Sequence, residues 1–142
     1  MQYVQTILLA DDDEDDRMLF EDALQQIRSE VRLSTAGDGH TLLKMLRKGP
    51  LPDVIFLDLN MPGKNGFECL QEIRKEEAFR PIPVIIFSTT SQLDAVNRTY
   101  ELGANYFMRK PPSFAALKKL LNHVFTLDLR TPKAPGRETF LI

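Results

Sequence analysis

Five residues with reactive oxygen or amino groups stand at the ends of apolar, strand-like segments. They are Asp11, Asp12, Asp58, Ser88 and Lys110, and the preceding segments read ILLA, VIFL, VIIF and YFM in chain order. In an open parallel sheet the carboxyl ends of the strands share one edge, and ligand sites form there. We therefore expect four distant segments to bring three carboxylates, a hydroxyl and an ammonium group to one place. Such a set suits a divalent cation and a phosphoryl group.

Strand-like and helix-like segments alternate five times along the chain, which predicts an α/β fold. The expected strands span residues 4–10, 31–36, 53–57, 84–87 and 105–108. The expected helices span 15–28, 38–48 and 91–102, with a third helix after the loop 61–66 and a last one after Ser113. Five such units imply right-handed crossovers, a parallel sheet and helices on both of its faces.

Composition and length indicate one compact domain that works inside the cell. The chain has 142 residues and a formal net charge of −2, so it offers no broad basic field for direct nucleic-acid binding. No apolar run approaches the ~18 residues that a membrane-spanning helix needs, and the N-terminus does not have the pattern of a signal peptide. The single cysteine, Cys69, excludes an internal disulfide and fits a reducing compartment. We expect a cytoplasmic protein without membrane insertion.

The last residues differ in character from the rest. We expect a domain over residues 1–127 and a C-terminal tail over 128–142, where two prolines and a glycine prevent the preceding helix from continuing. Two interpretations remain open for this tail. It is either flexible, as chain termini commonly are, or its final residues 140–142 dock on a partner or on a second copy. We expect the flexible form.

The motifs ILLADDDEDDR, VIFLDLNMPGKNGFE, PVIIFSTTS and LGANYFMRKPP occur in this order over residues 5–127. Together they resemble the receiver domain of two-component response regulators, and the pattern is most similar to small, single-domain, chemotaxis-regulator-like receivers. The resemblance implies a flavodoxin-like, doubly wound sheet of five parallel strands in the order 2-1-3-4-5, with five helices. This order would place the first and third strands side by side, together with the aspartates that follow them.

The resemblance also implies a role for each site residue. Asp58 would be the phosphoacceptor. Asp12, Asp58 and the main-chain carbonyl of Asn60 would bind Mg²⁺ directly, and Asp11 would act on the metal through water. Lys110 would pair with a phosphoryl oxygen. Carboxylates are ligands that Mg²⁺ prefers, and a compact ammonium suits phosphate.

Two further residues have roles implied by the resemblance. Ser88 would donate its hydroxyl to a phosphoryl oxygen, and Phe107 would change rotamer as that hydroxyl moves. For Phe107, plain core packing is an equally good interpretation. The family also holds the peptide bond between Lys110 and Pro111 in the cis form.

The function that follows is a stand-alone signalling switch. A sensor histidine kinase or a histidine phosphotransfer protein would donate a phosphoryl group to Asp58 in a Mg²⁺-dependent reaction. The changed surface of the fourth helix, fifth strand and fifth helix would then bind a downstream protein target, with the chain a monomer or a phosphorylation-dependent homodimer. We expect no enzymatic activity beyond self-catalysed phosphorylation and dephosphorylation.

Two other functions compete with this one. A haloacid-dehalogenase-like phosphohydrolase would use residues 11–13 as its Asp-x-Asp nucleophile motif, although this chain has no room for a cap domain. A phosphorylation-independent receiver-fold binding module would use no phosphate at all. The aspartate that becomes phosphorylated discriminates among the three functions.

Overall fold

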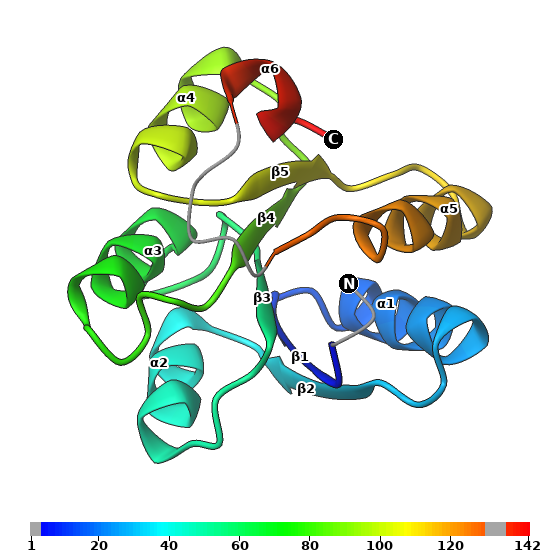
Figure 1. Cartoon of the computed structure of the whole chain (residues 1–142), viewed down its shortest axis with the longest axis horizontal. Helices are drawn as coiled ribbons and strands as arrows, with labels where there is room; N and C mark the ends of the chain where they lie inside the picture. Colours follow the sequence, from blue (N-terminus) through cyan, green and yellow to red (C-terminus); the bar gives the residue numbers. More distant parts are fainter. Residues whose placement is uncertain (1–3, 130–135) are drawn as a thin grey trace.

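The computed structural model describes residues 4–129 and 136–142, and one five-stranded parallel sheet forms its centre (Figure 1). The strands are β1 Thr6–Ala10, β2 Arg32–Ala36, β3 Val54–Leu57, β4 Val84–Ser88 and β5 Tyr106–Arg109. The main helices are α1 Glu14–Ile27, α2 Gly39–Lys48, α3 Gly66–Lys75, α4 Leu93–Glu101 and α5 Phe114–Val124, and a short α6 spans Arg137–Phe140. The strand order β2-β1-β3-β4-β5 confirms the prediction, and α6 is an addition to it.

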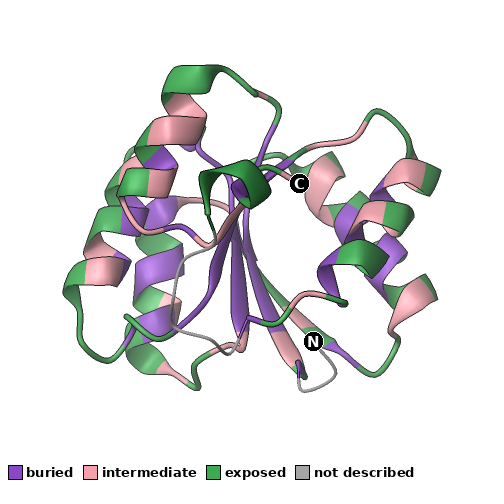
Figure 2. Cartoon of the chain, turned by 45° about the horizontal axis from the view of Figure 1, so that its top comes forward, coloured by how far each residue is buried: buried purple, intermediate pink, exposed green. Residues whose placement is uncertain are grey.

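Helices cover both faces of the sheet, which divides the core into two parts. Helices α1 and α5 lie on one face, and α2, α3 and α4 lie on the other (Figure 1). The strands in the middle are buried (Figure 2). Every residue of β3 and of β4 is buried, as expected for parallel strands with helices on both sides. Edge strand β2, by contrast, buries only Ala36.

Side-chain caps fix where most helices begin. The side chains of Asp13, Asp38, Asn65 and Ser113 each accept a hydrogen bond from a backbone N–H in the first turn of the helix that follows. Asp38 and Ser113 thus begin the two helices that the sequence predicts at these positions. Helix α4 has no side-chain cap and begins at Leu93, two residues later than predicted.

The tail is where the structure differs most from the sequence-based expectation. Residues 136–142 fold against β5 instead of extending away from the domain, while 130–135 lie outside the described residues. Phe140 is 1 % exposed and makes edge-to-face contacts with Tyr100 of α4 and Phe107 of β5. The N–H of Ile142 donates to the carbonyl of Phe107 at 2.9 Å.

The physical reason for this docking is that β5 is an edge strand with unpaired backbone groups. A short segment satisfies them by adding to the edge, and an aromatic side chain buried beside it stabilises the addition. Arg137, at the start of α6, contacts helix α4. Its guanidinium donates to the side-chain oxygen of Asn97 at 2.8 Å and lies over the Tyr100 ring. The domain boundary expected after residue 127 stays a prediction.

Phe140→Ala is expected to lower the free energy of unfolding by about 1–3 kcal/mol, which is below the roughly 3–5 kcal/mol usual for loss of a buried aromatic ring. The loss is limited because residues 136–142 can detach locally while the sheet stays folded. Urea denaturation measures the loss, and hydrogen exchange at the Ile142 amide detects the detachment. Leu141→Ala is the matched control, since that side chain is 49 % exposed and should cost little. Equal losses in the two variants would contradict the docking of Phe140.

Candidate functional site

The register of the central strands brings the predicted residues to one edge of the sheet. Ala10 of β1 is paired with Leu57 of β3, so the residues that follow them, Asp11 and Asp58, lie side by side. The N–H of Asp58 donates to the carbonyl of Ala10 at 2.9 Å, which extends the pairing by one residue. The backbone ladder thus sets the spacing of these two carboxylates.

The three predicted carboxylates form one cluster. Oxygen atoms of Asp11, Asp12 and Asp58 all lie within 4.8 Å of one another. Asp11 is fully buried and Asp58 is 4 % exposed, whereas Asp12 faces solvent. Two buried acids beside an accessible one give a cation a route from solvent to hard oxygen ligands.

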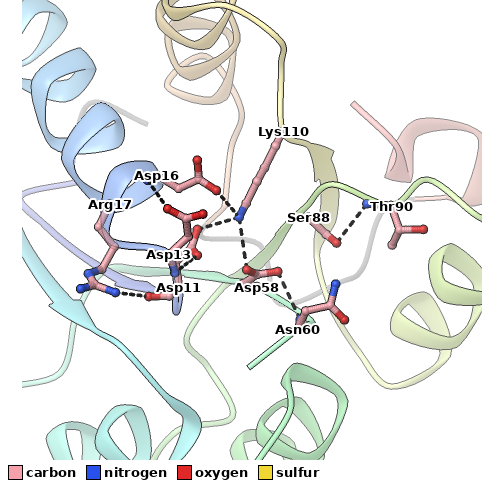
Figure 3. A network of polar contacts seen from close by, with 9 residues as sticks. All are labelled: Asp11, Asp13, Asp16, Arg17, Asp58, Asn60, Ser88, Thr90 and Lys110. Atoms are coloured by element: carbon pink, nitrogen blue, oxygen red, sulfur yellow. Dashed lines mark hydrogen bonds and ion pairs between the residues drawn. The ribbon is translucent and has the colours of Figure 1, made fainter. Parts of the chain in front are cut away.

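Lys110 faces this cluster, as Figure 3 shows. Its Nζ lies 2.9 Å from Asp11 Oδ2 and 3.2 Å from Asp58 Oδ2. A third carboxylate, Asp16 Oδ2 from the first turn of α1, lies 2.8 Å away. Burial by itself lowers the pKa of Lys110, but its close contacts with the Asp11 and Asp16 carboxylates and the charge of Asp58 outweigh this effect and raise the pKa above its ordinary value. The ammonium is therefore a permanent positive charge in the site.

One detail implied by the resemblance is wrong. Within residues 4–129 and 136–142, the peptide between Gly49 and Pro50 is the only cis bond, so the one between Lys110 and Pro111 is trans. Lys110 reaches the site because its own N–H donates to the carbonyl of Ser88 at 2.8 Å. This bond continues the β4–β5 ladder past Arg109 and fixes the start of the lysine side chain.

Ser88 and Asn60 lie at the same edge, each with a contact of its own. The Ser88 hydroxyl is buried and accepts a hydrogen bond from the N–H of Thr90 at 3.3 Å. The N–H of Asn60 donates to Asp58 Oδ1 at 3.3 Å. Figure 3 places both residues beside Asp58. Metal binding by the Asn60 carbonyl and phosphoryl binding by Ser88 stay predictions.

Phe107 is fully buried in β5, where its ring contacts Phe140. Core packing thus describes its surroundings in this conformation. Its second interpretation, a ring that changes rotamer with Ser88, stays a prediction.

The electrostatics of Asp11 favour a bound cation. Burial raises the pKa of Asp11 to about 6, against the lowering effects of Lys110 and of the Asp13 N–H. Among the described residues, Asp11 Oδ2 is one of two buried side-chain oxygens without a hydrogen bond, and its contact with Lys110 is an ion pair at 2.9 Å. A buried carboxylate oxygen in this state is costly, and a hard cation would satisfy it. The residues present therefore fit a Mg²⁺ ion.

Three contributors to the site were not found from the sequence. Arg17 donates to the carbonyl of Asp11 at 2.7 Å and holds the loop after β1. Gly66 starts α3 so close to the Asp58 loop that a Cβ there would overlap the Asp58 carbonyl oxygen. Asp16 contacts Lys110, although its position in an acidic run suggested only a helix N-terminal charge. Each of these contacts depends on how α1 or α3 sits against the sheet edge.

Asp11→Asn is expected to stabilise the protein without divalent ions at pH 7 but much less at pH 4. A folded pKa near 6, above the usual 3.8, means that the folded state binds the proton more tightly, so this group's contribution to stability falls as the pH rises from about 4 to 6. Asparagine mimics the protonated form of Asp11. The free energy of unfolding of the variant, relative to the parent, should therefore rise by about 2 kcal/mol between pH 4 and pH 6.

Urea denaturation of both chains at pH 4 and pH 7 measures this difference, and Asp12→Asn, at the exposed neighbour, is the control. A constant advantage at both pH values would contradict the raised pKa. Added Mg²⁺ should reduce the difference in stability between Asp11→Asn and the parent at pH 7, because a ligand that binds only the folded parent stabilises it.

The site thus consists of acids at the carboxyl ends of parallel strands with a half-buried lysine facing them, at the sheet edge where open α/β domains bind their ligands. Residues 7–122 match the family model described as the response regulator receiver domain. The chain therefore belongs to this family of two-component signalling proteins, as its motifs predicted. Among the described residues, no helix is both long enough and apolar enough to span a membrane.

Full-length relatives and solved structures agree with this assignment. The response regulator Rcp1 of Synechocystis sp. is 30 % identical over 136 residues, which cover 92 % of each chain. The probable methanogenesis regulatory protein FilR2 of Methanothrix harundinacea is 31 % identical over 135 residues, covering 92 % of this chain and 87 % of FilR2.

Two solved structures extend the likeness to three dimensions. The phosphorylated cyanobacterial phytochrome response regulator RcpA superposes with a TM-score of 0.82 at 29 % identity, over 94 % of this chain and 99 % of RcpA. The Mn²⁺-bound form of Rcp1 superposes with a TM-score of 0.79 at 30 % identity, over 93 % of this chain and 99 % of Rcp1.

Proposed function

We propose that this chain is a stand-alone response regulator that accepts a phosphoryl group on Asp58. The donor is a sensor histidine kinase or a histidine phosphotransfer protein, and the reaction depends on Mg²⁺. One observation carries the proposal: the buried Asp58 carboxylate has a lysine ammonium 3.2 Å from its Oδ2 and forms one cluster with the Asp11 and Asp12 carboxylates. The phosphorylated RcpA structure and the Mn²⁺-bound Rcp1 structure support it by analogy.

The chemistry is a displacement at phosphorus by the Asp58 carboxylate. A bond forms between an Asp58 oxygen and phosphorus, and the bond from phosphorus to the donor nitrogen breaks, leaving the electron pair on the histidine. Asp11, Asp12 and Asp58, with the Asn60 carbonyl, would hold the Mg²⁺ ion. When bound, that ion neutralises charge on the phosphoryl oxygens. Lys110 and Ser88 pair with the remaining oxygens of the transferred group.

The phosphorylated chain would signal through a shift in the equilibrium between two conformations of the domain. New contacts from Lys110 and Ser88 to the phosphoryl group favour one arrangement of α4, β5 and α5 over the other. Phe107 lies on β5 and its ring contacts Phe140 of the docked tail, so a change in that ring would reach this surface. A downstream protein target reads the surface, with the chain a monomer or a phosphorylation-dependent homodimer.

We place this exchange in the cytoplasm. The chain's single cysteine, Cys69, is a free and buried thiol, which fits a reducing compartment. Burial raises the pKa of the Cys69 thiol to about 12, so the thiol stays protonated and unreactive.

The test is to incubate the protein with Mg²⁺ and a small acyl phosphate, and to map the modified residue by mass spectrometry. We expect one phosphoryl group on Asp58 and none when a chelator removes the Mg²⁺. Modification of Asp11 would instead indicate the phosphohydrolase. No modification of either residue, with Mg²⁺ present, would favour the phosphorylation-independent binding module.

A further inference from the structure

Asp16 touches the site but stands apart from its cation-binding cluster. Its Oδ2 accepts a hydrogen bond from Lys110 Nζ at 2.8 Å, across 94 residues of sequence. The cluster of carboxylate oxygens within mutual reach contains Asp11, Asp12 and Asp58 but not Asp16. Figure 3 shows Asp16 and Asp58 on different sides of the lysine nitrogen.

The ammonium group of Lys110 has three protons, so it can contact three acceptors at once. In the structure three carboxylates surround Nζ: Asp16 at 2.8 Å, Asp11 at 2.9 Å and Asp58 at 3.2 Å. Two of these acids, Asp11 and Asp58, belong to the cation-binding cluster, so their oxygens would hold the ion and, at Asp58, the phosphoryl group. Asp16 lies outside this cluster, so its carboxylate stays available to Lys110 when the cation and the phosphoryl group are bound.

Asp16 is itself held in place. It lies in the first turn of α1, and its N–H donates to the side chain of Asp13, the N-cap residue, at 3.0 Å. Helix α1 is anchored by Phe20, which is fully buried and contacts the Phe87 ring edge-to-face. Lys110 Nζ lies 5.4 Å from the centre of that same ring. Helix α1, which carries Asp16, and the Lys110 side chain therefore both pack against Phe87 of β4.

We propose that Asp16 is a positioning residue, which holds the Lys110 ammonium beside Asp58 while the other acids bind the cation. The inference rests on the proposed function. Asp16 would contribute to binding of the phosphoryl group through Lys110, and it would contribute little to binding of the cation. A lysine is flexible and loses much side-chain freedom when it is fixed, so a partner that fixes it beforehand reduces that loss upon phosphoryl binding.

The experiment compares Asp16→Asn with Asp15→Asn in the full chain. Asp15 lies next to Asp16 in the first turn of α1, is exposed and carries the same charge, so its variant reproduces the general loss of negative charge. Two affinities are measured by NMR titration: for Mg²⁺ alone, and for a beryllofluoride phosphate mimic at saturating Mg²⁺. Amide spectra of each variant show that it is folded.

Asp16→Asn should weaken binding of the mimic about tenfold relative to Asp15→Asn, the scale of one charge-assisted hydrogen bond. The two variants should bind Mg²⁺ equally, and Asp16→Glu, which keeps the carboxylate, should recover part of the loss. Equal mimic affinity in the two asparagine variants would overturn the inference, as would a loss that appears equally in Mg²⁺ binding. If the parent itself fails to bind the mimic at Asp58, the proposed function is overturned, and this inference with it.

Discussion

Asp58→Asn should abolish phosphorylation by an acyl phosphate and leave the fold intact. The amide is nearly isosteric with the carboxylate but is not a nucleophile, so the covalent bond to phosphorus cannot form. Stability should not fall, because the substitution removes one charge from a crowded group of acids. Intact-protein mass spectrometry after incubation with Mg²⁺ and the phosphodonor measures the first effect, and thermal denaturation measures the second.

Asp53→Asn is a suitable control for this prediction. Asp53 precedes β3 at the opposite end of the same strand, where its carboxylate accepts hydrogen bonds from Gln5 and Thr6. That variant should keep full phosphorylation. A label that persists in Asp58→Asn and disappears in Asp11→Asn would show that the chain is a phosphohydrolase instead.

Lys110→Ala should separate metal binding from the response to phosphate. Mg²⁺ should bind at least as tightly as in the parent, because a positive charge that competes for Asp11 and Asp58 is gone. The mimic beryllofluoride should bind about 10- to 100-fold more weakly, since the charge-assisted contact of the lysine ammonium with a fluorine of the mimic, which stands in for a phosphoryl oxygen, is lost. Conformational response should fall as well, because a ligand shifts an equilibrium only through contacts that differ between the two states.

NMR shifts of residues 88–125, with and without beryllofluoride, measure that response. Lys119→Ala is the matched control, because Lys119 is an exposed lysine on α5 and its loss removes the same charge. Parent-like shifts around Tyr100 and Phe107 in Lys110→Ala would show that this lysine takes no part in the switch.

Local chemistry in the sequence determined the architecture and which acids meet at the sheet edge. Apolar runs set the strands, Asp38 and Ser113 cap the helices that follow them, and Gly103 takes the left-handed conformation that glycine readily adopts after a helix, with φ +99°. The acids after β1 and β3 were predicted to meet because parallel strands end at a common edge. Periodicity, caps and strand ends are properties of neighbouring residues, so one sequence suffices to find them.

Only the tertiary structure decided which long-range partner each side chain takes. Asp16 looked like any acid at a helix N-terminus, and its contact with Lys110 exists because α1 packs beside the end of β5. Phe140 looked like part of a loose terminus, and it is buried because β5 is an edge strand with Tyr100 and Phe107 beside it. Such contacts depend on the packing angles and positions of whole elements, which are set by the complete core and not by the residues around the contact.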